Sequence, residues 1–332
     1  MTGKRSFGGI DVGKLCLAVI VAAVHTLTIE SGVPLLNRAW TELQAYPVPF
    51  FFLAAGFFLG RRLQKPFSAR ENRAALTGYL RRMARMYALW SLVYFPFAFP
   101  GYLLSAGSAG KAFLDYACDA LFFGSYGPFP ALWYLLAAVY AALLLLLLHA
   151  LRSPDGGVLC AGLAFIVIYR FIQSHIWMSG VQAPALRFLQ HAYLATFRSG
   201  RVFLGCVYVP IGVFLSRRMP PRPAAAAMLA LGFGGEVLRS GLPWLALPLR
   251  VTGTVGLFSL AASVQTPERR AFYVCRYMST GIYFTHMLVW YVYCMAVRGA
   301  LTRSPDAFFA ALAVSALLSL GYAHIRLKKK HG

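Results

Sequence analysis

The sequence has 332 residues, of which 59% are apolar and only 13% carry a charge. Soluble domains have about twice that share of charged residues, so the composition excludes an ordinary soluble protein. The net charge of +22 lies mostly in short links between apolar runs, a pattern typical of membrane proteins that meet anionic lipid. We therefore expect membrane lipids, and no nucleic acid, among the partners.

Apolar runs of about 20 residues recur along the chain and predict an all-α fold, a polytopic bundle of transmembrane helices. Ten spans are expected, at about residues 10–29, 46–60, 79–99, 131–150, 157–175, 201–216, 224–241, 246–264, 272–296 and 307–325. With ten spans, the links fall alternately on the two sides of the membrane. The links on the same side as the N-terminus hold about twice as many basic residues as the links on the other side, which predicts that both termini are cytoplasmic. We expect a single domain, residues 1–332, in the cell inner (cytoplasmic) membrane.

The third span and the link after it have an unusual composition. Pro96 and Pro100 interrupt the span, which predicts a kink or an early end of the helix. In the link 101–130, the stretch Phe113–Phe123 is apolar enough for an interfacial or re-entrant helix.

The first span carries Asp11, Lys14 and His25. At ~100° per residue, Lys14 and His25 fall within ~20° of the same helix face and lie ~16 Å apart along the axis. A neutral imidazole can act as a general base near neutral pH. The alternative is a lysine that extends to the membrane surface and a histidine that is hydrogen-bonded within the bundle.

Three arginines, Arg81, Arg82 and Arg85, begin the third span. Arg82 and Arg85 are neighbours on one helix face because three residues make almost one turn. Paired guanidinium groups suit a phosphate-bearing ligand. Contact with lipid headgroups is the alternative.

Charged residues also fall inside or beside later spans, where each is costly unless it faces the interior or a wet cavity. Arg170 lies in the fifth span, and Glu236 and Arg239 lie late in the seventh. A structural ion pair and a substrate site are both consistent with them. Arg198 and Arg201 flank the start of the sixth span, where a helix N-terminus can help to hold an anion.

His286 lies in the ninth span, within Tyr283-Phe284-Thr285-His286. A histidine inside a membrane span is a functional candidate, and a hydrogen bond within the bundle is the alternative. The six cysteines include no C-x-x-C pair, so we expect neither a metal site nor a disulfide framework.

Five short elements, taken in order, resemble the acyltransferase-3 family of integral membrane acyltransferases. They are Gly9-Ile10-Asp11-Val12-Gly13-Lys14 with His25-Thr26, Pro49-Phe50-Phe51-Phe52-Leu53-Ala54-Ala55-Gly56-Phe57, Arg82-Met83-Ala84-Arg85, Leu132-Trp133-Tyr134-Leu135, and Ser279-Thr280-Gly281-Ile282-Tyr283-Phe284-Thr285-His286. Ala55 stands where the family has serine. Within the family, residues 9–26 and 196–212 are most similar to the membrane part of vancomycin-resistance serine racemases, which has been considered a serine transporter.

The resemblance implies a membrane O-acyltransferase that takes an acyl group, usually acetyl, from cytoplasmic acyl-CoA. The acceptor would be a hydroxyl group, often on a carbohydrate of the cell envelope, and no cofactor would be bound permanently. Carried over by position, His25 is the catalytic base, and Lys14, Arg82 and Arg85 bind the donor.

The remaining polar candidates form a second group, for the acceptor or for support of the site. Its members are Asp11, Arg170, Arg201, Glu236, Tyr283 and His286. The alternative function is transport of a small solute, for example serine, by the same membrane domain.

Overall fold

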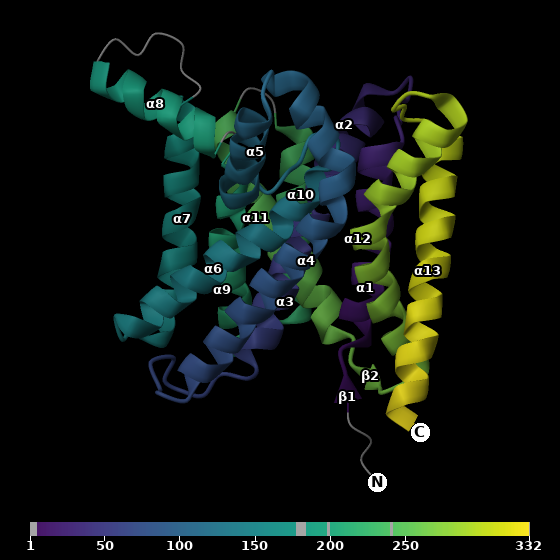
Figure 1. Cartoon of the computed structure of the whole chain (residues 1–332). Coiled ribbons are helices and arrows are strands. Elements are labelled where there is room, and N and C mark those ends of the chain that lie inside the picture. Colours follow the sequence, from purple (N-terminus) through teal and green to yellow (C-terminus); the bar gives the residue numbers. More distant parts are fainter. Residues whose placement is uncertain (1–4, 177–183, 198–199, 240–241, 332) are drawn as a thin grey trace. The chain divides into compact units, whose positions relative to one another are not determined.

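The computed structural model describes residues 5–176, 184–197, 200–239 and 242–331, and these are almost entirely helical (Figure 1). In chain order the elements are β1 (Arg5–Ser6), α1 (Gly8–Thr26), α2 (Pro34–Leu43), α3 (Pro47–Gly60), α4 (Asn72–Ala106), α5 (Ala109–Cys118), a π-turn (Asp119–Phe123), a 3-10 turn (Pro130–Leu132), α6 (Trp133–Ala150), α7 (Asp155–Ile176), α8 (Pro184–Thr196), a 3-10 turn (Arg201–Phe203), α9 (Leu204–Leu215), α10 (Arg222–Leu238), a 3-10 turn (Pro243–Leu245), α11 (Ala246–Ser263), β2 (Thr266–Pro267), α12 (Arg270–Arg298) and α13 (Pro305–His331).

Seven helical stretches within the described residues are long and apolar enough to cross a membrane. They are Gly8–Thr26, Pro34–Gly60, Asn72–Ala106, Pro130–Ala150, Pro243–Ser263, Arg270–Arg298 and Pro305–Lys328. The all-α, multi-pass membrane fold is thereby confirmed. The count of ten spans, the cytoplasmic termini and the single domain stay predictions; α9, for example, has 12 residues, about 18 Å at the α-helical rise.

Of the two alternatives predicted for the third span, a kink or an early end, the early end is wrong. Helix α4 continues through Pro96 and Pro100 to Ala106 and stops at Gly107, whose φ is +73°. Proline is tolerated inside membrane helices because neighbouring groups satisfy the backbone carbonyls that it leaves free. The following link is helical, as the apolar stretch indicated, and begins earlier than predicted, at Ala109.

Contacts along the chain define two compact units. Unit 1 comprises Met1–Phe51 and Pro220–Gly332, and unit 2 comprises Phe52–Met219.

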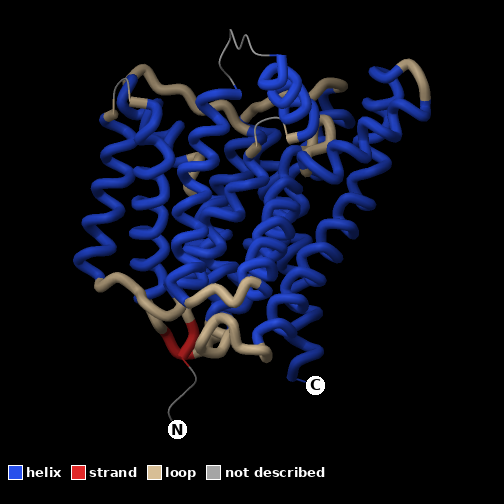
Figure 2. Tube along the Cα trace, turned by 90° about the vertical axis from the view of Figure 1, so that its left-hand side faces the viewer, coloured by secondary structure: helices blue, strands red, loops and turns tan. Residues whose placement is uncertain are grey.

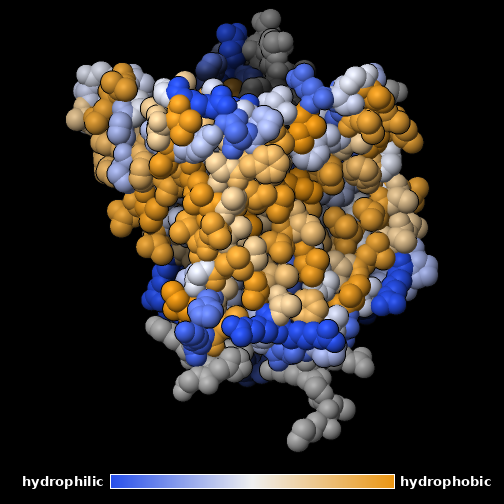
Figure 3. All heavy atoms as spheres, turned by 90° about the vertical axis from the view of Figure 1, so that its right-hand side faces the viewer, coloured by the Kyte–Doolittle hydropathy of each residue, from blue (hydrophilic) through white to orange (hydrophobic). Residues whose placement is uncertain are grey.

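In unit 1, helix α12 packs against both α1 and α13, and these three helices run side by side in Figure 1. Strands β1 and β2, red in Figure 2, pair antiparallel with Arg5 opposite Pro267. On the face that includes α13, Figure 3 shows an apolar band with hydrophilic residues at both edges, as expected for helices exposed to lipid.

Helices α10 and α11 make a second close pair in unit 1. Their backbones approach at Gly256, where a Cβ atom would collide with the backbone of Leu229 and Ala225. Small residues at such a crossing let two membrane helices pack tightly.

In unit 2, helix α6 packs against α4 and α9, and α9 also packs against α7. The loop before α4 is fixed by Asn72, whose side chain accepts a hydrogen bond from the Gln64 amide at 2.7 Å and donates to the carbonyls of Gln64, Pro66 and Phe67. Asn72 therefore ties the loop to the first residue of α4.

Candidate functional site

Two histidines from different helices of unit 1 meet. His25 lies in the last turn of α1 and is half-buried, and His286 lies within α12 and is fully buried. Their rings are stacked, with centroids 5.6 Å apart and an interplanar angle of 27°. The sequence predicted both residues as candidates but gave no reason to place them together.

His286 is oriented by its own helix. Its Nδ1 lies 2.9 Å from the carbonyl oxygen of Ile282, one turn earlier. A carbonyl only accepts a hydrogen bond, so Nδ1 is the protonated nitrogen. The other nitrogen, Nε2, is buried and has no hydrogen-bond partner among the described residues.

Aromatic side chains lie beside His286. The Tyr283 ring lies 6.3 Å from the His286 ring and 6.0 Å from the Phe51 ring, measured between centroids. Tyr283 is 5% exposed. His286, which is fully buried, therefore lies beside an aromatic cluster, where the electrostatic interactions of an imidazole are strengthened.

Asp11 is almost fully buried near the start of α1 and accepts two hydrogen bonds from the Arg276 guanidinium on α12, at 3.0 and 2.8 Å. Arg276 was not among the residues predicted for the site, because nothing in the local sequence links it to Asp11. Lys14 lies one turn after Asp11 and is half-buried. Helix α1 thus carries charged groups near its start and His25 near its end.

The two predicted donor arginines belong to unit 2. Arg82 and Arg85 are both exposed on α4, and neither forms an ion pair within the described part of the chain. The Arg82 guanidinium lies over the Tyr79 ring, 5.6 Å from its centroid. Exposed, uncompensated cations of this kind are available for an anionic ligand.

Arg201 begins the 3-10 turn that leads into α9. Its guanidinium donates a hydrogen bond of 2.8 Å to the Ser125 hydroxyl. It also lies 5.0 Å from the Phe123 centroid and 5.4 Å from the Trp133 centroid. These contacts hold Arg201 to the segment before α6 and to the first residue of α6, and its role in an acceptor site stays a prediction.

Glu236 has a different partner from the one its position suggested. It is fully buried on α10 and pairs with Arg250 on α11 at 2.7 Å. Arg250 also contacts Glu42 on α2 at 2.8 Å, and Arg239 contacts Glu42 at 3.3 Å. Sequence reasoning missed Glu42 and Arg250, because their partners come from other helices.

For two further predicted residues, the described part of the chain shows no partner that would indicate a binding site. Arg170 on α7 is half-buried, and its Nε has no hydrogen-bond partner among the described residues. Arg198 lies outside the described residues. Within the described chain, no group of three His, Cys, Asp or Glu side chains is placed to hold a metal ion.

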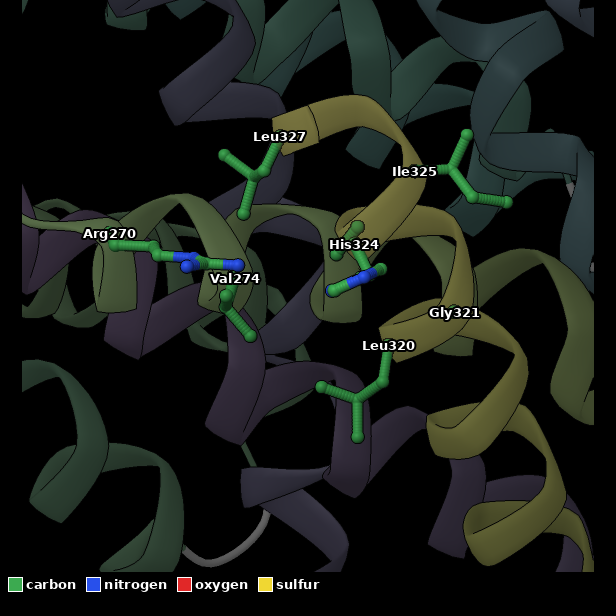
Figure 4. Close-up of a pocket in the computed structure, with 8 residues that line it drawn as sticks. Arg270, Val274, Leu320, Gly321, His324, Ile325 and Leu327 are labelled. Atoms are coloured by element: carbon green, nitrogen blue, oxygen red, sulfur yellow. The ribbon is translucent and has the colours of Figure 1, made fainter. Parts of the chain in front are cut away.

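A groove of about 570 Å³ lies between α12 and α13. Figure 4 shows Arg270 and Val274 contributed by α12 and Leu320 and His324 by α13. Its lining is mainly apolar, and neither His25 nor His286 belongs to it.

Comparison with protein families places these residues in context. A family model described as an acyltransferase domain matches residues 7–324, nearly the whole chain. The chain belongs to the acyltransferase-3 family. The matched range covers all of unit 2 and most of unit 1 of this acyltransferase-3 chain, and every candidate residue named above falls within it.

Two amino-acid racemases from Enterococcus faecalis are similar to part of the chain. One is 32% identical over 151 residues, which is 45% of this chain and 20% of the racemase. The other is 28% identical over 144 residues, which is 43% of this chain and 18% of that racemase. The chain therefore matches only about a fifth of each relative's length. No solved structure matches this acyltransferase-3 chain.

Proposed function

We propose that the chain is an O-acyltransferase of the cell inner membrane that moves an acetyl or other acyl group from cytoplasmic acyl-CoA to a hydroxyl acceptor, such as an envelope carbohydrate. The observation that carries the proposal is the histidine pair within a domain of the acyltransferase-3 family. His25 is the general base, and Lys14, Arg82 and Arg85 bind the phosphates of the donor.

The chemistry requires a base that is neutral before the reaction and accepts a proton during it. His25 removes the proton of the acceptor hydroxyl while the hydroxyl oxygen bonds to the acyl carbon. The carbon–sulfur bond of the thioester breaks, and the proton passes from His25 to the sulfur of CoA. General-base catalysis of this kind contributes roughly 10²–10⁴-fold to the rate.

The test is acyl transfer by cells and by purified protein. Acetate released by mild alkali from the envelope of expressing cells measures esters, and free thiol formed from acetyl-CoA measures turnover. In His25→Ala we expect both signals to fall by about 10²–10⁴-fold, with unchanged insertion in the membrane.

The matched control is His191→Ala, because His191 is an exposed histidine on α8. It should transfer acyl groups like the wild type. Undiminished transfer by His25→Ala, or no transfer by the wild type, would overturn the assignment.

A second candidate function is transport of a small amino acid such as serine. Two observations favour it: the relatives are named for amino acids, and Glu42, Glu236, Arg239 and Arg250 bring both charge signs together. Carboxylates suit an ammonium group, and guanidiniums suit a carboxylate.

Proteoliposome uptake distinguishes the two functions. Transport predicts uptake of labelled L-serine in the absence of acyl-CoA and loss of that uptake in Glu236→Gln. Acyltransferase function alone predicts no uptake by the wild type and turnover of acetyl-CoA.

A further inference from the structure

Nε2 of His286 is a hydrogen-bond acceptor to which none of the described residues donates. The hydrogen bond from Nδ1 to the Ile282 carbonyl fixes the single proton of the neutral ring on Nδ1. Nε2 therefore carries a lone pair. It is fully buried and unpartnered within the described residues.

Such an atom has a cost. Leaving a buried polar group without a hydrogen bond destabilises a protein by about 1–3 kcal/mol. Inside a membrane span, the protein itself has to satisfy its buried polar groups. A phenylalanine or leucine would avoid this penalty, so a state of the protein in which a donor faces Nε2 accounts better for the histidine.

The neighbouring ring can supply that donor. The His25 ring is stacked beside the His286 ring, with the centroids 5.6 Å apart, so a turn of the His25 side chain is needed to point an N–H at Nε2. A neutral imidazole has one N–H, whereas an imidazolium has two. When His25 takes up the proton of the acceptor hydroxyl, it gains a second donor and a positive charge beside the fully buried His286, whose lone pair then stabilises that charge.

We infer that His286 is a positioning residue for His25: its Nε2 accepts an N–H of His25 while His25 holds the proton taken from the acceptor hydroxyl. The bond orients His25 and stabilises the imidazolium, as a carboxylate does for the histidine of a serine-protease triad. The proton then returns through His25 to the CoA sulfur, and His286 stays neutral throughout. This inference rests on the proposed function.

Two substitutions separate the lone pair from the ring that carries it. His286→Phe keeps a planar ring and removes the acceptor, whereas His286→Gln supplies an amide oxygen as acceptor. In His286→Phe we expect kcat to fall by about 10–100-fold, the usual effect of losing a group that orients a functional histidine. The KM for acetyl-CoA should stay within about twofold, and His286→Gln should recover most of kcat.

Met287→Leu is the matched control for packing. Met287 is the next residue on α12 and is 2% exposed, and the change conserves volume. We expect wild-type kcat from this variant. Thermal unfolding in detergent identifies any variant that is merely misfolded.

A double-mutant cycle decides between positioning and independent roles. If His286 acts through His25, adding His286→Phe to His25→Ala should lower the residual rate no further, because residues that act as a unit are non-additive. Losses that multiply, or a wild-type kcat in His286→Phe, would overturn the inference. Neither outcome affects the proposed function, which fails only if His25→Ala itself retains acyl transfer.

Discussion

Asp11 and Arg276 join α1 to α12 through two parallel hydrogen bonds, although they lie at opposite ends of the sequence. The Asp11 carboxylate is 1% exposed, whereas the Arg276 side chain is 46% exposed. Removing the arginine therefore leaves a buried anion without its cation. We expect Arg276→Gln to lower the free energy of unfolding by about 1–3 kcal/mol, less than for a fully buried pair because solvent reaches the arginine.

Thermal unfolding in detergent checks this prediction. Arg269→Gln is the control, because Arg269 is exposed and forms no ion pair within the described residues. Adding Asp11→Asn to Arg276→Gln should recover part of the loss, since the uncompensated charge is removed. Equal melting temperatures for Arg276→Gln and the wild type would contradict the structural role.

Arg82 and Arg85 should affect donor binding more than chemistry. Each charge-assisted hydrogen bond to a phosphate is worth about 1.5–3 kcal/mol. We expect Arg82→Gln and Arg85→Gln each to raise the KM for acetyl-CoA by about tenfold or more, with kcat little changed. Steady-state kinetics with acetyl-CoA measures this.

Acetyl-pantetheine is an internal control for that experiment, because it keeps the thioester and lacks the phosphate groups bound by arginine. Its KM should be the same in both variants and in the wild type. Arg73→Gln, at an exposed position ~180° around α4 from Arg82, should leave the KM for acetyl-CoA unchanged. A KM increase shared by all three variants would indicate a general effect of basic charge.

The crossing of α10 and α11 predicts opposite effects for two glycine-to-alanine changes. At Gly256 a Cβ atom meets the backbone of Leu229 and Ala225, whereas at Gly234 no atom lies within 4 Å. We expect Gly256→Ala to destabilise the protein by about 1–3 kcal/mol through overpacking. Gly234→Ala should stabilise it slightly, by up to about 1 kcal/mol, because alanine is the better helix former. Melting temperatures that shift in the same direction would refute the crossing geometry.

Replacing Arg201 with lysine should destabilise the segment that its guanidinium contacts. A lysine keeps the charge but loses the planar group that stacks over Phe123 and Trp133. We expect Arg201→Lys to speed amide hydrogen exchange in residues 119–133, measured by mass spectrometry. Arg218→Lys, at an exposed position, is the control, and equal exchange in both variants would argue against the stacking contribution.

Much of the helical architecture follows from hydropathy alone, because a bilayer demands long apolar runs with internally satisfied backbones. Lys14 and His25 do lie on one helix, α1. Helix α2 was not predicted, because Arg38 and Glu42 interrupt its apolar pattern. Its start has a local signal in Pro34, the first residue of the helix.

The partners within the site were harder to predict. Periodicity gives the face of a helix on which His286 or Glu236 lies, but not the helix that packs against that face. Glu236 illustrates this: its neighbour in sequence, Arg239, contacts Glu42, while Glu236 itself contacts Arg250. Each buried carboxylate requires a cation, so Arg250 and Arg276 were possible partners of Glu236 and Asp11. The sequence does not tell which arginine belongs to which carboxylate.

Helix α4 is longer than the hydrocarbon core of a membrane is thick. The helix has 35 residues, which is about 52 Å at 1.5 Å per residue. From Met86 to Ala106 it rises about 30 Å, the thickness of a bilayer's hydrocarbon core. If that apolar part spans the core, Arg82 and Arg85 fall at the boundary between lipid and water. A water-soluble donor could then reach both guanidiniums without leaving the aqueous phase.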